Sequence, residues 1–125
     1  MNRNLSPDEF EGYPEPTGLS EDRVSSRLQP WDVGVDDMLD VYEAADAVEP
    51  RVGTVPLAGL SAYQRDVERP SLDHLVQHGD FDRMPPIEVV KHGPVMAVRD
   101  GSHRANAAIV RGMKDIHAQV REIGP

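Results

Sequence analysis

The residues best suited to chemistry are five consecutive ones, Asp100 to Arg104, which read Asp-Gly-Ser-His-Arg. Asp100-Gly101 is a turn dipeptide, and we expect the hydroxyl of Ser102 to cap a helix that follows it. The first N–H groups of a helix lack partners within the helix and carry partial positive charge. With the side chains of His103 and Arg104 beside them, these groups predict an anion site suited to phosphate. An ordinary capped turn with two solvated polar side chains would explain the same residues.

Short apolar segments on both sides are expected to position this turn. Residues 95–98 predict a strand that runs antiparallel to a preceding strand over residues 87–90. The helix after Ser102 has an apolar stripe at Ala105, Ala108 and Ile109 and is expected to end near Gly112. Residues 116–120 alternate between apolar and polar side chains, which predicts a last strand.

The preceding stretch is expected to contribute one short strand and one helix. Residues 54–57 predict an extended segment with Gly53 and Gly59 as breaks, and residues 61–69 are expected to be irregular. A helix over residues 72–78 is expected to begin after Pro70-Ser71 and to stop at Gly79. His74 and His78 stand four residues apart on that helix, either as a metal pair or as two exposed polar residues. The alternation of strands and helices predicts a small mixed α/β (α+β) sheet flanked by helices, over residues 51–125.

Residues 1–50 are expected to form an acidic N-terminal arm that includes one helix. Residues 1–30 are rich in proline and acidic side chains and are expected to be irregular, with a short helix over residues 21–28 as an alternative. Trp31 is expected to anchor this arm onto the domain. A helix near residues 36–48, capped by Asp36 or Asp37, would bury one apolar face, consisting of Met38, Leu39, Tyr42 and Ala45.

Composition and charge exclude several classes of protein. The 125 residues contain no cysteine, which excludes disulfides, thiolate metal sites and a cysteine nucleophile. Neither a membrane-spanning run nor a signal peptide is evident, so we expect a cytoplasmic protein that does not enter a membrane. Residues 1–50 carry 13 acidic and 3 basic side chains, a net charge of −10, whereas residues 51–125 carry a net charge of +1. This distribution makes high-affinity DNA binding unfavourable but leaves the C-terminal part able to accept an anion.

The order of the motifs resembles the ParB N-terminal/sulfiredoxin superfamily over about residues 52–123. The motifs that carry the resemblance are Val55-Pro56-Leu57, Gln64-Arg65, Leu72 with Leu75, Pro85-Pro86-Ile87, Asp100-Gly101-Ser102-His103-Arg104, and Gly112 with Ile116. The resemblance implies a nucleotide site, for ATP or CTP, in which the loop Gly101–Arg104 surrounds the phosphates. The pair Gln64-Arg65 is similar to the Gln-Pro-Arg box of ParB proteins, without its proline, and would reach the same nucleotide.

Departures from the family narrow the expected activity. Ser102 stands where sulfiredoxins have their cysteine, so sulfiredoxin activity is not expected. ParB partition proteins continue into helix-turn-helix and dimerisation domains that the residues up to Pro125 do not include, so sequence-specific DNA clamping is not expected. The free-serine kinases of this superfamily place a glutamate base near the position of Gln64 or Arg65, and glutamine cannot take a proton.

Three hypotheses for the function follow. In the first, the turn amides and Arg104 hold nucleotide phosphates, His103 donates to a phosphate oxygen, and Asp100 orients Mg²⁺ or Arg104. The protein would then be an Mg²⁺-dependent nucleotide hydrolase or phosphotransferase, with Asp100 and His103 as the candidate catalytic residues. The second is a ParB-like nuclease or DNA-associated protein. The third is a non-catalytic regulatory protein, of the kind found in phages or mobile elements, whose acidic arm contacts a protein partner. An oligomer is compatible with all three.

Overall fold

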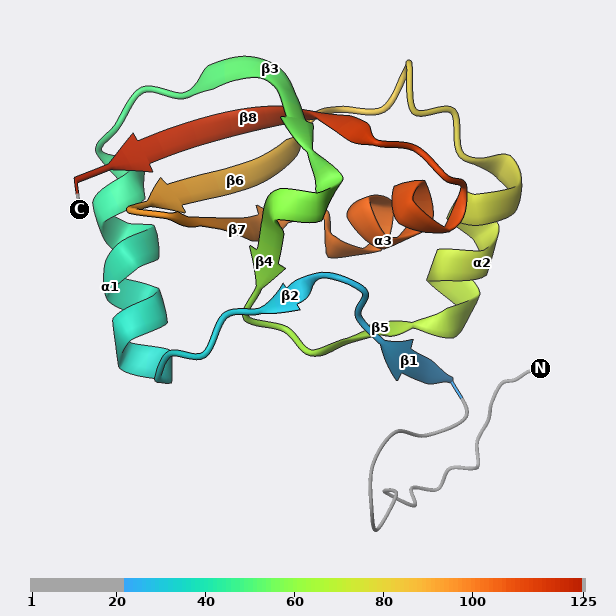
Figure 1. Ribbon diagram of the computed structural model, residues 1–125, viewed down its shortest axis with the longest axis horizontal. Helices are drawn as coiled ribbons and strands as arrows, with labels where there is room; N and C mark the ends of the chain where they lie inside the picture. The colour runs from blue at the N-terminus through green and yellow to red at the C-terminus, as the bar shows by residue number, and fades with distance from the viewer. Residues whose placement is uncertain (1–21, 125) are drawn as a thin grey trace, which may run out of the picture.

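The computed structural model describes residues 22–124, which form a mixed α+β fold. A six-stranded sheet with the order β2-β4-β7-β6-β8-β3 lies beside a two-stranded sheet formed by β1 and β5 (Figure 1). The elements are β1 (Arg23–Ser25), β2 (Gln29–Pro30), α1 (Val35–Asp46), β3 (Arg51–Pro56), the 3-10 turn η1 (Leu57–Gly59), β4 (Leu60–Ala62), β5 (Asp66–Glu68), α2 (Arg69–His78), β6 (Ile87–His92), β7 (Val95–Asp100), α3 (Ser102–Val110) and β8 (Asp115–Ile123).

The centre of the large sheet agrees with the sequence-based prediction. β6 and β7 form the expected antiparallel hairpin, and β8 pairs in parallel with β6. The alternation in β8 is confirmed, because Ile116, Ala118 and Val120 are buried while His117 is exposed. These three strands form the platform from which α3 begins.

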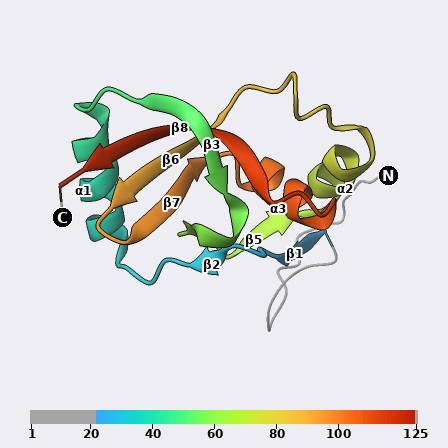
Figure 2. The same cartoon turned by 45° about the horizontal axis from the view of Figure 1, so that its top comes forward.

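The helices divide between the two ends of the molecule. α1 lies at one end of the sheet, whereas α2 and α3 lie side by side at the other end (Figure 1 and Figure 2). α3 buries Ala105 and Ala108 in the main core, and Ala107 in a smaller core with Val67 and Leu72. The predicted helices 36–48 and 72–78 correspond to α1 and α2. No helix among residues 22–124 is long and apolar enough to cross a membrane.

The prediction for residues 22–30 is wrong, because this segment is part of the sheets. β1 pairs antiparallel with β5, β2 pairs in parallel with β4, and Leu28 between them is buried in the main core. Strands of two or three residues have too few side chains to show an alternating pattern, so pairing with distant residues determines their structure. Residues 1–21 lie outside the described part of the chain, and the predictions for them stay predictions.

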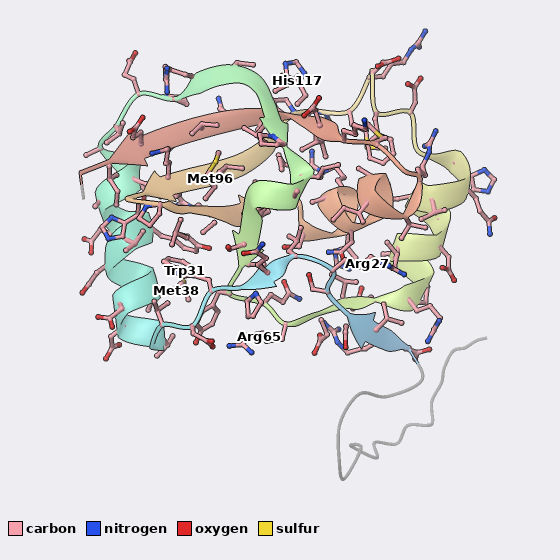
Figure 3. All side chains as sticks on the ribbon, in the orientation of Figure 1. Arg27, Trp31, Met38, Arg65, Met96 and His117 are labelled. Carbon is pink, nitrogen blue, oxygen red and sulfur yellow. The ribbon has the colours of Figure 1, made fainter. Side chains whose placement is uncertain are left out.

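Trp31 is buried, which agrees with its expected place as an anchor on the domain. Its exposed fraction is 6%, and its ring centroid lies 5.9 Å from that of Tyr42 on α1. The Arg99 guanidinium lies 5.4 Å from the centroid of the Tyr42 ring and donates to Asp46 at 2.7 Å. Figure 3 shows Trp31 beside α1, close to Met38 of the same helix. The indole therefore connects the chain before α1 to the sheet through this helix.

Several local predictions are also wrong. The N-cap of α1 is Gly34 with no side-chain cap, so neither Asp36 nor Asp37 caps this helix. Leu39 is 54% exposed, because the buried face of α1 is narrower than its apolar stripe. Gly53 lies inside β3 instead of ending it, since an edge strand that pairs only with β8 tolerates a glycine. Residues 61–69, expected to be irregular, contain the end of β4 and the whole of β5.

Candidate anion site

The turn between β7 and α3 is fixed by a glycine that no other residue can replace without strain. Gly101 has φ = +108°, in the region that favours glycine. A Cβ atom at this position would lie 2.5 Å from Cγ2 and 2.8 Å from Cβ of Ile87, the first residue of β6. Because Ile87 is fully buried, it cannot move aside. The chain can therefore turn from β7 into α3 in this direction only with a glycine at position 101.

The first turn of α3 has amide groups that no side chain caps. The first helical hydrogen bond runs from Ala105 N–H to Gly101 C=O, at 2.9 Å. The N–H groups of Ser102, His103 and Arg104 precede it and so have no acceptor within the helix. Gly101 is the N-cap and makes no side-chain hydrogen bond, so the prediction that the Ser102 hydroxyl caps the helix is wrong. Ser102 is already the first helical residue, one position beyond the place from which a hydroxyl caps.

Arg104 folds back over this turn. Its side chain is 19% exposed, and its Nη2 lies 3.5 Å from Oδ2 of Asp100. Nη1 donates to the backbone carbonyl of Pro85, just before β6. The position of a Cβ on Gly101 would be 3.2 Å from Nη2 of Arg104, which places the guanidinium directly beside the glycine. The Asp100 carboxylate is therefore the charged neighbour of Arg104 at this turn, and its expected role toward the guanidinium stays a prediction.

His103 points to a different neighbour. Its Nε2 accepts a hydrogen bond of 3.0 Å from the backbone N–H of Glu68, where β5 meets α2. An imidazole nitrogen that accepts has no proton, so in this arrangement the proton is on Nδ1. The structure thus separates the imidazole of His103 from the guanidinium of Arg104, although the residues are adjacent in sequence. In this arrangement, only the Nδ1–H group of the His103 ring could donate a hydrogen bond to a phosphate oxygen.

Gln64 and Arg65 lie in the loop between β4 and β5. Because β4 runs parallel to β7, this loop and the Gly101 turn leave the sheet at the same edge. The backbone carbonyl of Arg65 accepts from Ser26 N–H, but its guanidinium pairs with Asp32. The side chain is 59% exposed and points away from the body of the molecule in Figure 3. The structure does not bring the Arg65 side chain to the start of α3, and Gln64 is exposed.

Sequence reasoning missed Asn106, a fully buried polar residue on α3. Its Oδ1 accepts from Arg27 N–H at 2.6 Å, and its Nδ2 donates to Ser102 C=O at 2.8 Å and to Ser26 Oγ at 3.2 Å. These bonds join the first turn of α3 to the segment between β1 and β2. The signal was present, since asparagine is unfavourable inside a helix and here stands among alanines.

Perturbed pKa values occur around the Tyr42 ring. A hydrogen bond from Arg99 lowers the pKa of Asp46, and the same bond raises the pKa of Arg99. Burial raises the pKa of Tyr42, and the positive charge of Arg99 opposes this shift. Arg99 and Asp100 are consecutive in β7, so their side chains lie on opposite faces of the sheet. The Arg99–Asp46 pair therefore belongs to the attachment of α1.

Candidate metal ligands are sparse in the described part of the chain. His74 and His78 are exposed on α2, with ring centroids 5.1 Å apart. No group of three or more histidine or acidic residues among residues 22–124 is arranged to hold a metal ion. Mg²⁺ bound with nucleotide phosphates needs only one or two protein carboxylates, and Asp100 is the carboxylate beside the α3 turn.

Comparisons with known proteins assign no family. No protein-family model matches the chain, and no curated protein has significant sequence similarity to it. The resemblance to the ParB/sulfiredoxin superfamily stays a prediction from the motifs.

Proposed function

We propose that the chain binds a nucleotide, ATP or CTP, and that the start of α3 holds its phosphates. The observation that carries the proposal is the uncapped first turn of α3, fixed by Gly101, with the Arg104 guanidinium beside it. The free amide groups, the dipole of α3 and the Arg104 guanidinium would then all attract the same anion. The motif resemblance favours a nucleotide over a simple phosphate.

Binding requires Arg104 to change partners. Its present acceptors are a neutral carbonyl and one carboxylate at 3.5 Å. A terminal phosphate has more negative charge than either, and it can accept two N–H donors from one guanidinium. Asp100 would then be available to a Mg²⁺ ion carried by the nucleotide, which supplies charge neutralisation at the phosphates. Hydrolysis or phosphotransfer with Asp100 and His103 as catalytic residues stays a prediction.

Isothermal titration calorimetry with ATP and CTP, each with Mg²⁺, tests the proposal. We expect saturable binding at micromolar concentrations that Arg104→Gln weakens at least ten-fold, about 1.4 kcal/mol, since a charge-assisted bond to phosphate is lost. Arg51→Gln is the matched control, because Arg51 is 77% exposed on the distant edge strand β3. Circular dichroism spectra establish that both variants fold. Absence of binding with both nucleotides, or equal loss in both variants, would overturn the proposal.

A further inference from the structure

A second hollow lies at the opposite end of α3 from the candidate anion site. It has a volume of about 560 Å³ and is bounded by η1, β2, the C-terminal end of α3 and the loop that leads into β8. The volume falls within the range typical of small-molecule sites. A helix of nine residues separates the two places by roughly 13 Å. The hollow is therefore a separate feature from the α3 N-terminus.

The floor of this cavity is apolar. Leu57 and Leu60 lie at its base and are buried in the main core, and Ile109 and Met113 pack against that core from α3 and the loop that follows it. A hydrogen bond of 3.4 Å from Gln29 Nε2 to Ala58 C=O closes one wall. Water in such a cavity has few groups with which to bond, so an apolar molecule would displace it favourably.

The rim of the cavity has more positive than negative charge. It contains Arg27, Lys114 and Asp115. Within residues 22–124, the side chains of Arg27 and Lys114 form no ion pair, whereas most other cations in that range do. Both are fixed at the rim by backbone bonds, Arg27 N–H to Asn106 and Leu57 N–H to Lys114 C=O. The two charged side chains thus extend from a fixed backbone at the rim, and neither is neutralised by an acidic side chain among residues 22–124.

We propose that this cavity binds a small apolar anion, such as an aromatic carboxylate or sulfonate. The apolar part lies on Leu57, Leu60 and Ile109, and its single negative charge lies between Arg27 and Lys114. A nucleotide is a poor ligand here, because its several negative charges would meet two cations beside the carboxylate of Asp115. The proposal does not depend on nucleotide binding at the α3 N-terminus.

Two related fluorescent probes test the charge requirement. 8-Anilinonaphthalene-1-sulfonate has an apolar body with one sulfonate, and N-phenyl-1-naphthylamine has a similar body without it. We expect saturable one-to-one binding of the sulfonate, weakened about three-fold by Arg27→Gln or Lys114→Gln and unchanged by Arg51→Gln. The neutral probe should bind with an affinity that none of these variants changes. Since both rim residues are held by backbone atoms, the substitutions leave the fold intact, and thermal melts check this.

Methyl NMR of methionine locates the bound probe. Met113 lines the cavity, whereas Met38 lies on α1 at the other end of the molecule (Figure 3). Titration with the sulfonate should shift the Met113 methyl signal and leave that of Met38 in place. A shift of Met38 alone, no saturable binding, or binding that Arg104→Gln weakens and Arg27→Gln does not would each overturn the proposal. The last result would place the anion at the start of α3 and thereby support the nucleotide site.

Discussion

Replacing Gly101 with alanine should destabilise the fold more than the same change at Gly112, another turn glycine with positive φ. The new methyl group would lie 2.5 Å from Cγ2 of Ile87, and φ = +108° is strained for any residue with a Cβ. Backbone strain costs about 1–3 kcal/mol and forced overpacking of a buried neighbour about 1–3 kcal/mol. The free energy of unfolding should therefore fall by about 2–6 kcal/mol.

Gly112 offers a control that isolates the backbone contribution. It has φ = +79°, but a Cβ there would meet nothing within 4 Å. Gly112→Ala should therefore cost only the strain, about 1–3 kcal/mol. Urea unfolding followed by circular dichroism measures the free energy of unfolding of both variants. The comparison holds when the two variants have the same dependence of this free energy on urea concentration. If Gly101→Ala lowers the free energy of unfolding no more than Gly112→Ala does, the close approach of Ile87 is not what requires a glycine at this turn.

Three further predictions concern the attachments of the helices. Asn106→Ala should lower the free energy of unfolding by about 1–3 kcal/mol in urea titrations, because the Arg27 N–H is left without its buried acceptor. Trp31→Ala should cost about 3–5 kcal/mol in the same assay, and the emission of this only tryptophan should shift to the red when urea exposes it. Arg99 lowers the pKa of Asp46 in the folded protein, so their pairing stabilises the fold above the ordinary carboxyl pKa and this contribution is lost as the pH falls below it. Unfolding titrations of the wild type and Asp46→Asn should differ at pH 6 and converge near pH 2; a difference independent of pH would contradict this assignment.

The central elements of the fold could be predicted from the sequence because their patterns are local. The apolar run before Asp100, the alternation in 116–120 and the alanine stripe after Gly101 each require only neighbouring residues to be recognised. α2 was identified by Pro70 at its start and Gly79 at its end, the residues that begin and end helices for steric reasons.

What could not be predicted depends on partners far away in the chain. β1 and β5 have three residues each and exist because they pair with one another across more than 40 positions. Leu39 belongs to the apolar stripe of α1 but lies outside the part of it that the sheet covers. No local rule indicates that the fold leaves part of an apolar stripe exposed.

The candidate site was predicted in composition but not in arrangement. The sequence placed His103 and Arg104 at one helix start, and the structure does so too, but with the imidazole directed to Glu68 and the guanidinium to Pro85. The sequence could not show that the Arg65 side chain pairs with Asp32, because this acidic partner lies 33 residues away. Side-chain direction at a helix start depends on which carbonyl or amide a neighbouring strand offers, and sequence spacing contains no information on that.

An amide NMR titration with ATP and with CTP tests the central claim most directly. Binding of phosphate at the start of α3 predicts that the backbone amide signals of Ser102, His103 and Arg104 shift most, in a saturable manner, and that this response is lost in Arg104→Gln. Amides that stay in place at saturating nucleotide, or the largest shifts at Ile109 and Met113, would contradict a phosphate site on this helix.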